Sequence, residues 1–218
     1  CASRAISLED TAKLLRQRGA AMQSCVDRGE GAMAAILGLS SVEIEDVIGN
    51  FSGPGTCQIA NDNDPKQVVI SGQKSAVQEV IELTKKKGAR RALLLNVSAP
   101  FHCNLMKPAA EIMQEFLSDI IIMEPRVPIV MNTRAKTVFD TGKIRTFLVD
   151  QIVEMVRWRE SIEYMYSQGV TSFYELGAGN VLSGMVKRTV SKAKAVAIYS
   201  QQDILSTVES FNNGNYKK

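Results

Sequence analysis

The sequence contains a single histidine in 218 residues, and none of its four cysteines forms a CxxC pair with another. Structural and catalytic zinc sites use cysteine and histidine side chains at short spacings, so this scarcity predicts that the chain binds no metal. It also argues against a disulfide framework and favours free thiols in a reducing compartment, which we take to be the cytoplasm. The cysteines are Cys1, Cys25, Cys57 and Cys103.

Long apolar runs and strongly charged runs are also missing. No stretch approaches the roughly 20 apolar residues that a membrane-spanning helix needs, and the first residues do not resemble a signal peptide. The net charge is only +3, and no dense basic run is interleaved with aromatic residues, so neither a membrane nor a nucleic acid is a predicted partner. A mild positive charge favours an acidic protein partner.

Two common catalytic signatures are absent from the sequence. It has no GxxxxGK[ST] phosphate-binding loop and no GxSxG nucleophile elbow. A Gly177-x-Gly179 turn between a predicted strand and a predicted helix could direct backbone N–H groups toward an anion. A close-packed turn explains one GxG better, so we predict no permanently bound cofactor.

Residues 31–96 show a regular alternation of apolar patterns. They predict the order β-α-β-β-α-β, which is typical of a ferredoxin-like subdomain. Ser40 or Ser41 is expected to begin the first helix, and Gly88 to end the second. The last strand contains Ala92–Leu95, an apolar run bounded by charge, which predicts a buried strand. The four strands are predicted at 31–38, 57–61, 67–72 and 90–95, and the helices near 42–48 and at 75–87.

After residue 96, predicted helices alternate with predicted strands, which favours a parallel α/β sheet. The polar tail 212–218 is expected to fray. Helices are predicted at 105–121, 143–153 and 159–168, then from 180 to 188 and near 203, with strands at 129–132, 172–176 and 195–198.

Three polar residues could carry chemistry. His102 lies at a strand-to-helix junction, where catalytic groups are frequent in α/β folds, although spacing alone favours a structural histidine. Ser7 is expected to cap the first predicted helix, which runs through Met22. Arg18, near the end of this helix, could bind a carboxylate or could be a solvated charge. Gln151 lies in an apolar stretch and needs hydrogen-bond partners if it is buried, but an exposed helix face is equally compatible.

Several segments in order resemble the acyl carrier protein S-malonyltransferases. The resemblance implies an α/β fold with an α/β-hydrolase-like large domain, residues 1–30 and 97–218, and an inserted ferredoxin-like small domain, residues 31–96. The segments that carry it are RGAAMQ at 18–23, GAMAAILGL at 31–39, QVVISG at 67–72, NVSAPFH at 96–102, VRW at 156–158 and YELGAGNVLSGM at 174–185.

The resemblance also implies a function and a set of site residues. Members transfer malonyl from malonyl-CoA to the phosphopantetheine thiol of acyl carrier protein in fatty-acid biosynthesis, by a ping-pong Ser/His mechanism. By position, His102 would be the general base, and the backbone carbonyl of Gln151 would orient it. Arg18 would bind the malonyl carboxylate as a bidentate pair. Phe101 would fill the space that an α-methyl group needs, and Asn61 would line the CoA side.

We expect the enzyme to be a monomer. Four basic residues are candidates for docking of the acidic carrier protein, although scattered solvated charges explain them equally well. They are Arg90, Arg91, Lys187 and Arg188.

The chain departs from the family pattern in two places. Met155 stands where a proline is usual, and the GHSxG segment with the nucleophilic serine is absent. We therefore expect the chain to begin inside a larger protein and to be inactive alone. Two alternatives stay open, a non-catalytic fragment that binds carrier protein and the acyltransferase domain of a polyketide synthase.

Overall fold

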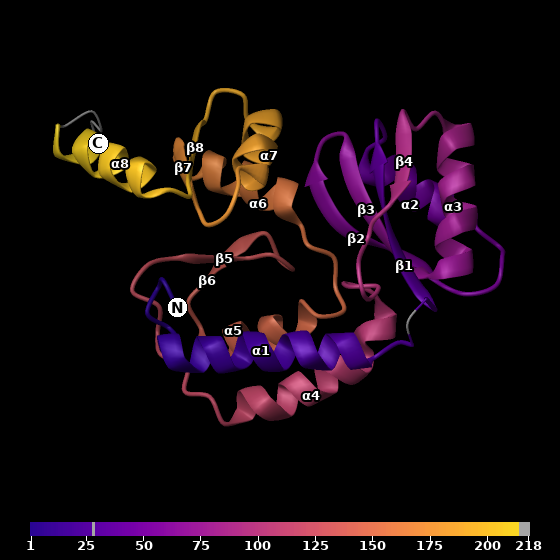
Figure 1. Cartoon of the computed structure of the whole chain (residues 1–218), viewed down its shortest axis with the longest axis horizontal. Coiled ribbons are helices and arrows are strands. Elements are labelled where there is room, and N and C mark those ends of the chain that lie inside the picture. The colour runs from indigo at the N-terminus through magenta and orange to yellow at the C-terminus, as the bar shows by residue number, and fades with distance from the viewer. Residues whose placement is uncertain (28, 214–218) are drawn as a thin grey trace. The chain divides into compact units, whose positions relative to one another are not determined.

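The computed structural model (Figure 1) describes residues 1–27 and 29–213. Residues 214–218, most of the tail that was predicted to fray, lie outside the described residues. The chain divides into two compact units, Cys1–Ser161 and Ile162–Lys218. Within the described residues, no helix has the length and apolar character needed to cross a membrane.

A four-stranded antiparallel sheet forms one part of the first unit, with the strand order β2-β3-β1-β4. Two helices cover one face of this sheet (Figure 1), and side chains from both layers form a buried core that includes Ile36, Ile44 and Val77. The predicted order β-α-β-β-α-β is the observed one. Its elements are β1 (Gly31–Leu37), α2 (Ser41–Gly49), β2 (Cys57–Asp64), β3 (Gln67–Gln73), α3 (Lys74–Lys87) and β4 (Arg91–Leu94).

Capping side chains fix the ends of these helices. Ser40 precedes α2, and its hydroxyl accepts a hydrogen bond from the backbone N–H of Glu43, whose carboxylate accepts one from the backbone N–H of Ser40. Gly88 ends α3 in the left-handed conformation, with φ at 109°, which glycine adopts at no steric cost. Ser40 rather than Ser41 is therefore the cap.

Three helices form the second part of this unit. The helices α1 and α4 lie side by side (Figure 1), and α5 packs with them around a core that includes Leu14, Met113 and Ile144. Ser7 caps α1 as predicted, by accepting a hydrogen bond from Asp10 N at 3.0 Å. The elements are α1 (Leu8–Ser24), the 3-10 helix η1 (Asn104–Met106), α4 (Lys107–Ser118) and α5 (Thr141–Asp150).

A short antiparallel pair, β5 (Ile129–Met131) and β6 (Lys136–Val138), lies between α4 and α5 in sequence. The sequence predicted a strand at 129–132 within a parallel sheet, and it did not predict β6. The prediction of parallel pairing is wrong here because the chain reverses at once through a turn in which Ala135 has φ of 49°. A tight turn joins antiparallel strands, whereas parallel strands need a long crossover connection.

The prediction of a buried strand at Ala92–Leu95 is also wrong. Leu93 is 53% exposed and Leu94 50% exposed. The strand β4 is an edge strand of the sheet and pairs only with β1 among the described strands. No described strand therefore covers the side chains of β4 from its outer edge. A short apolar run predicts a strand but does not show that both of its faces are covered.

The second unit contains a parallel pair, β7 (Ser172–Leu176) and β8 (Lys194–Ile198), joined by α7 (Val181–Thr189). Here the predicted parallel pairing is found. The helix α6 (Trp158–Ser167) runs across the division between the units, and α8 (Gln201–Asn212) is longer than the short helix predicted near Asp203. Tyr174 and Phe211 place their rings 5.5 Å apart, which packs α8 against β7.

Candidate active site

His102 lies in the connection between β4 and η1, where the backbone is constrained from two directions. Pro100 is buried against the first residue of β1, and a side chain at Gly31 would overlap the proline ring. Two residues later, His102 has φ of 58°, in the left-handed region that non-glycine residues rarely adopt. The close approach of Pro100 and the left-handed residue together determine where the imidazole lies.

The imidazole of His102 meets the backbone of Gln151, the residue that follows α5. Nδ1 of His102 lies 2.7 Å from the carbonyl oxygen of Gln151. A carbonyl oxygen can only accept a hydrogen bond, so Nδ1 carries the proton and Nε2 presents a lone pair. The structure thus brings together two of the predicted site residues, which are 49 positions apart in sequence.

Burial and charge both affect the protonation of His102. Burial lowers the pKa of the imidazole below its ordinary 6.5, and the positive charge of Arg18 lowers it further, while the backbone groups of Gln151 and Glu154 act in the opposite direction. Arg18, on the half-buried side of α1, has its own pKa lowered by burial. Arg18 therefore lies within electrostatic reach of His102, which sequence spacing alone did not show.

Phe101 and Asn61 are connected to the segments that contain His102 and Gln151. The ring of Phe101 packs on a small buried cluster formed by Met33, Ala60 and Val69 on the sheet. Asn61 lies in β2 and pairs with Val156 in a parallel bridge. This bridge joins β2 to the segment that follows Gln151.

The four predicted docking residues are all exposed. Arg90 comes immediately before β4 and Arg91 is its first residue, both in the first unit, whereas Lys187 and Arg188 lie in the last turn of α7 in the second. The two pairs belong to different units, so a single basic surface stays a prediction.

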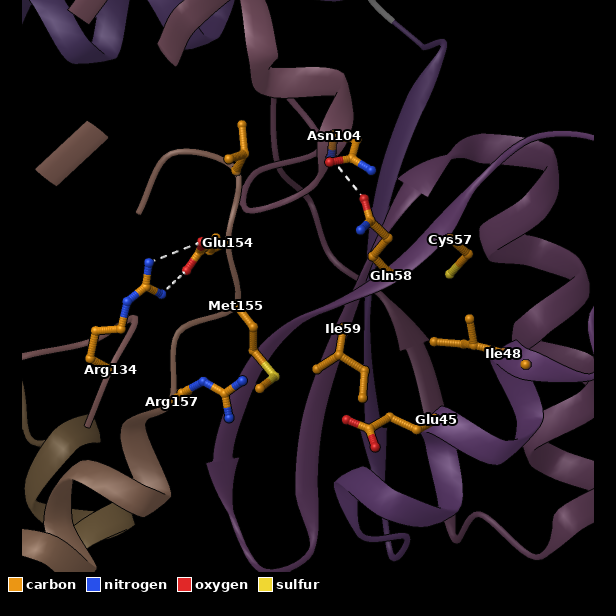
Figure 2. Close-up of a pocket in the computed structure, with 12 residues that line it drawn as sticks. Glu45, Ile48, Cys57, Gln58, Ile59, Asn104, Arg134, Glu154, Met155 and Arg157 are labelled. Carbon is orange, nitrogen blue, oxygen red and sulfur yellow. Dashed lines mark hydrogen bonds and ion pairs between the residues drawn. The ribbon is translucent and has the colours of Figure 1, made fainter. Parts of the chain in front are cut away.

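A pocket of about 740 Å³ borders the same region of the first unit (Figure 2). Figure 2 shows Arg134 pointing toward Glu154, and Gln58 pointing toward Asn104. The side-chain oxygen of Gln58 accepts a hydrogen bond from Asn104 N at 2.8 Å, which ties β2 to the residue two positions after His102. Arg134, Glu154 and Gln58 were not predicted as pocket residues, because nothing in their local sequence indicates the contacts that they make.

Two backbone N–H groups in the first turn of α7 are already bound by a carboxylate of the protein. The carboxylate of Glu175 accepts hydrogen bonds from the backbone N–H groups of Leu182 and Ser183, at 3.1 and 2.7 Å. The preference for a close-packed turn is wrong, since an added Cβ at Gly177 or Gly179 would meet nothing within 4 Å. Both glycines have positive φ, which explains the residue type.

Within the part of the chain that the structure describes, no three His, Cys, Asp or Glu side chains are grouped so as to hold a metal ion. The four cysteines are free thiols, and Cys57 and Cys103 are buried. Burial raises the pKa of the Cys57 thiol to about 12, so it is not a nucleophile near neutral pH.

Comparison with known proteins identifies the family. Residues 1–209 match the acyl transferase domain family. The chain belongs to this family. The malonyl CoA-acyl carrier protein transacylase of Bacillus subtilis (strain 168) is 39% identical over 215 residues, which are 98% of this chain and 68% of that protein. The resemblance seen in the sequence is thereby confirmed.

Solved structures agree with this assignment. The crystal structure of the acyl-carrier-protein S-malonyltransferase from Bartonella henselae has a TM-score of 0.93 at 42% identity, covering 97% of this chain and 68% of that one. A malonyl-transacylase solved in complex with a type II PKS acyl-carrier protein has a TM-score of 0.92 at 37% identity, covering 94% and 67%. This acyltransferase chain spans about two thirds of the length of these relatives.

The geometry of His102 predicts its titration. Because its pKa is lowered in the folded chain, the unfolded chain binds the proton first as the pH falls. The contribution of the neutral ring to stability is therefore complete above the ordinary pKa and is lost as the pH falls below it. The chain has one histidine, so a single imidazole signal in an NMR titration reports the pKa directly. A measured value above 6.5 would contradict the described environment.

Glycine is usually less stable than alanine at a given position, but at His102 we expect the reverse, because the backbone there is left-handed. Both His102→Ala and His102→Gly remove the hydrogen bond to Gln151, but only alanine retains a Cβ at a φ of 58°. We expect the glycine variant to be more stable by about 0.5–1 kcal/mol, since left-handed strain of about 1–2 kcal/mol exceeds the entropic cost of glycine. Urea unfolding of the two variants measures the difference. Equal stability would mean that the backbone at 102 is relaxed.

Proposed function

We propose that this chain carries the base and the acyl-recognition residues of a malonyl-CoA:acyl carrier protein transacylase. The observation that carries the proposal is the contact of 2.7 Å between His102 Nδ1 and the Gln151 carbonyl, which leaves Nε2 free to accept a proton. The names of the relatives support the same substrate and reaction. The proposal covers malonyl transfer in fatty-acid biosynthesis and requires no bound cofactor.

The reaction takes place in two half-reactions around the Nε2 atom of His102. A serine hydroxyl from outside these 218 residues attacks the thioester carbonyl of malonyl-CoA, and Nε2 takes its proton. The C–S bond of the tetrahedral intermediate then breaks, and Nε2 returns the proton to the CoA thiolate. In the second half-reaction the phosphopantetheine thiol gives its proton to Nε2 and attacks the serine ester, and the serine oxygen leaves with that proton.

The Gln151 carbonyl would orient the His102 ring in both half-reactions. It accepts from Nδ1–H throughout, so the ring stays in one tautomer and one orientation, and the imidazolium that forms is stabilised. A lowered pKa keeps the resting imidazole neutral, which is the only form that can act as a base.

Arg18 is the proposed partner of the malonyl carboxylate. Its guanidinium is half-buried and near His102, so a carboxylate bound there would hold the thioester close to the base. Phe101 would limit the space at the α-carbon, since its ring is fixed by packing on the sheet. Asn61 would face the CoA side from β2.

The proposed domain division follows the resemblance. Residues 31–96 would be a ferredoxin-like small domain, and residues 1–30 with 97–218 would belong to an α/β-hydrolase-like large domain. The antiparallel strand order β2-β3-β1-β4 supports the first assignment, and the parallel pair β7 and β8 supports the second. The enzyme would act as a monomer in the cytoplasm.

The proposed partner is an acyl carrier protein. The structure of a related malonyl-transacylase bound to a type II PKS acyl-carrier protein supports this choice. The candidates for this contact are exposed basic residues, taken separately in each unit: Arg90 and Arg91 in the first unit, and Lys187 and Arg188 in the second. The same relative supports a second candidate function, in which the malonyl group is loaded for polyketide synthesis instead of fatty-acid synthesis.

Intact mass distinguishes catalysis from a binding fragment. If the proposal holds, the protein purified from its own cells and incubated with malonyl-CoA gains a malonyl ester on a serine that lies outside these 218 residues. Incubation with acetyl-CoA is the control, because Arg18 would not retain an uncharged acyl group. A protein of 23.9 kDa with no adduct would instead indicate a non-catalytic carrier-binding fragment.

Arg18→Ala should remove the discrimination between acyl groups. Losing a charged hydrogen-bond partner should weaken malonyl-CoA binding by roughly 10- to 100-fold, with little effect on acetyl-CoA. Calorimetry with both thioesters measures the difference. Arg16→Ala is the matched control, because Arg16 is exposed on the same helix. Unchanged malonyl-CoA affinity in Arg18→Ala would remove Arg18 from the site.

A further inference from the structure

We propose that Arg134 is a positioning residue for His102, because it holds both ends of the turn whose carbonyl orients the imidazole. The inference rests on the proposed function, in which His102 is the base. Arg134 itself does not touch the reacting atoms. It lies in the turn between β5 and β6, which no motif in the sequence singled out.

One guanidinium spans the turn 151–154. Nη2 of Arg134 donates to the carboxylate of Asp150 at 2.7 Å, and Nη1 donates to the carboxylate of Glu154 (Figure 2). Asp150 is the last residue of α5, immediately before Gln151, and Glu154 comes three residues after Gln151. The guanidinium therefore fixes the distance between the two ends of the segment that carries the Gln151 carbonyl.

Arg134 is itself held in place. Its guanidinium lies over the ring of Phe147 in α5, with Cζ 4.6 Å from the ring centroid, and Nη1 also donates to the Thr133 carbonyl at 3.2 Å. A flat guanidinium stacked on a ring loses little further freedom when it binds two carboxylates. The arrangement differs from an isolated surface ion pair, because two carboxylates and an aromatic ring share one cation.

Without this cation, the turn would carry an uncompensated repulsion. Asp150 and Glu154 are four residues apart, and burial, together with the negative charge of Glu154, raises the pKa of the Asp150 carboxyl. Arg134 offsets that repulsion, and its own pKa is raised chiefly by its hydrogen bond to Glu154. Residues 151–155 contain no proline, so no ring restricts φ in the turn.

The far end of the segment is anchored separately. Val156 N donates to the Ala60 carbonyl at 2.8 Å, and Asp62 N donates to the Val156 carbonyl at 2.9 Å. Buried Asp62 in turn accepts a bidentate pair from Arg159. The segment is thus fixed to β2 beyond residue 155, and Arg134 fixes the part that faces His102. A hydrogen bond with the backbone of Glu154 also raises the pKa of His102, so the residue that Arg134 binds is linked to the imidazole.

The single histidine gives a readout that overall stability does not. In the intact chain, nitrogen chemical shifts of His102 report the ratio of the Nδ1–H to the Nε2–H tautomer. In Arg134→Gln we expect this ratio to fall by roughly fivefold, the effect of weakening one neutral hydrogen bond. Arg134→Lys should give an intermediate ratio, since one ammonium retains the charge but not the fork.

Arg157→Gln is the matched control. It removes another arginine of the same pocket and breaks the 3.0 Å ion pair with Glu160, but it leaves both contacts of Arg134 in place. We expect its tautomer ratio to equal that of the unchanged protein. If Arg134→Gln fails to fold, Glu154→Gln, which retains the pair of Arg134 with Asp150, should lower the ratio by a smaller factor.

The outcomes separate this inference from the proposed function. A folded Arg134→Gln protein with an unchanged tautomer ratio overturns the positioning role, even if its melting temperature falls. An equal fall in the ratio in Arg157→Gln overturns it too, because the effect would then be a general loss of charge. The proposed function fails on a different result, the absence of a malonyl adduct, which leaves the tautomer measurement intact.

Discussion

The hydrogen bond from His102 Nδ1 to the Gln151 carbonyl is the contact on which the rest of the site depends. It joins two segments 49 residues apart, and each is brought there by different packing. His102 lies in a connection that packs against the sheet, because Gly31 has no side chain and leaves room for the ring of Pro100. Gln151 lies at the end of α5, which packs in the helical core. The contact of 2.7 Å therefore depends on the packing of both the sheet and the helices.

Two features of His102 are unfavourable for folding and favourable for a base. Its backbone is left-handed, which costs free energy for any residue with a Cβ, and its ring is half-buried, which disfavours the charged form. Together they fix the ring and keep it neutral. Strain that persists at one residue, where the surrounding structure over-determines it, is typical of functional positions. Both features agree with the role of base that the proposed function gives to His102.

Much of the local structure could be predicted from the sequence, because it depends on residues close together in the chain. The order of elements in 31–96 follows from apolar periodicity, and the caps at Ser7 and Gly88 follow from residue type. The exposure of Leu93 and the hairpin at β6 could not be predicted, because they depend on what lies beside a strand. The pairing of His102 with Gln151 came from the family resemblance, whereas the contacts of Arg134 with residues 16 and 20 positions away had no local signal.

The closeness of Arg18 to His102 couples recognition to basicity in the proposed function. While Arg18 is unpaired with substrate, its charge lowers the pKa of the imidazole. A malonyl carboxylate bound to Arg18 would neutralise that charge and raise the proton affinity of Nε2. The base would then be strongest when the correct acyl group is bound. An uncharged acyl group would leave the half-buried Arg18 without a carboxylate partner and the base weaker, so one arginine opposes the wrong substrate both in binding and in proton transfer.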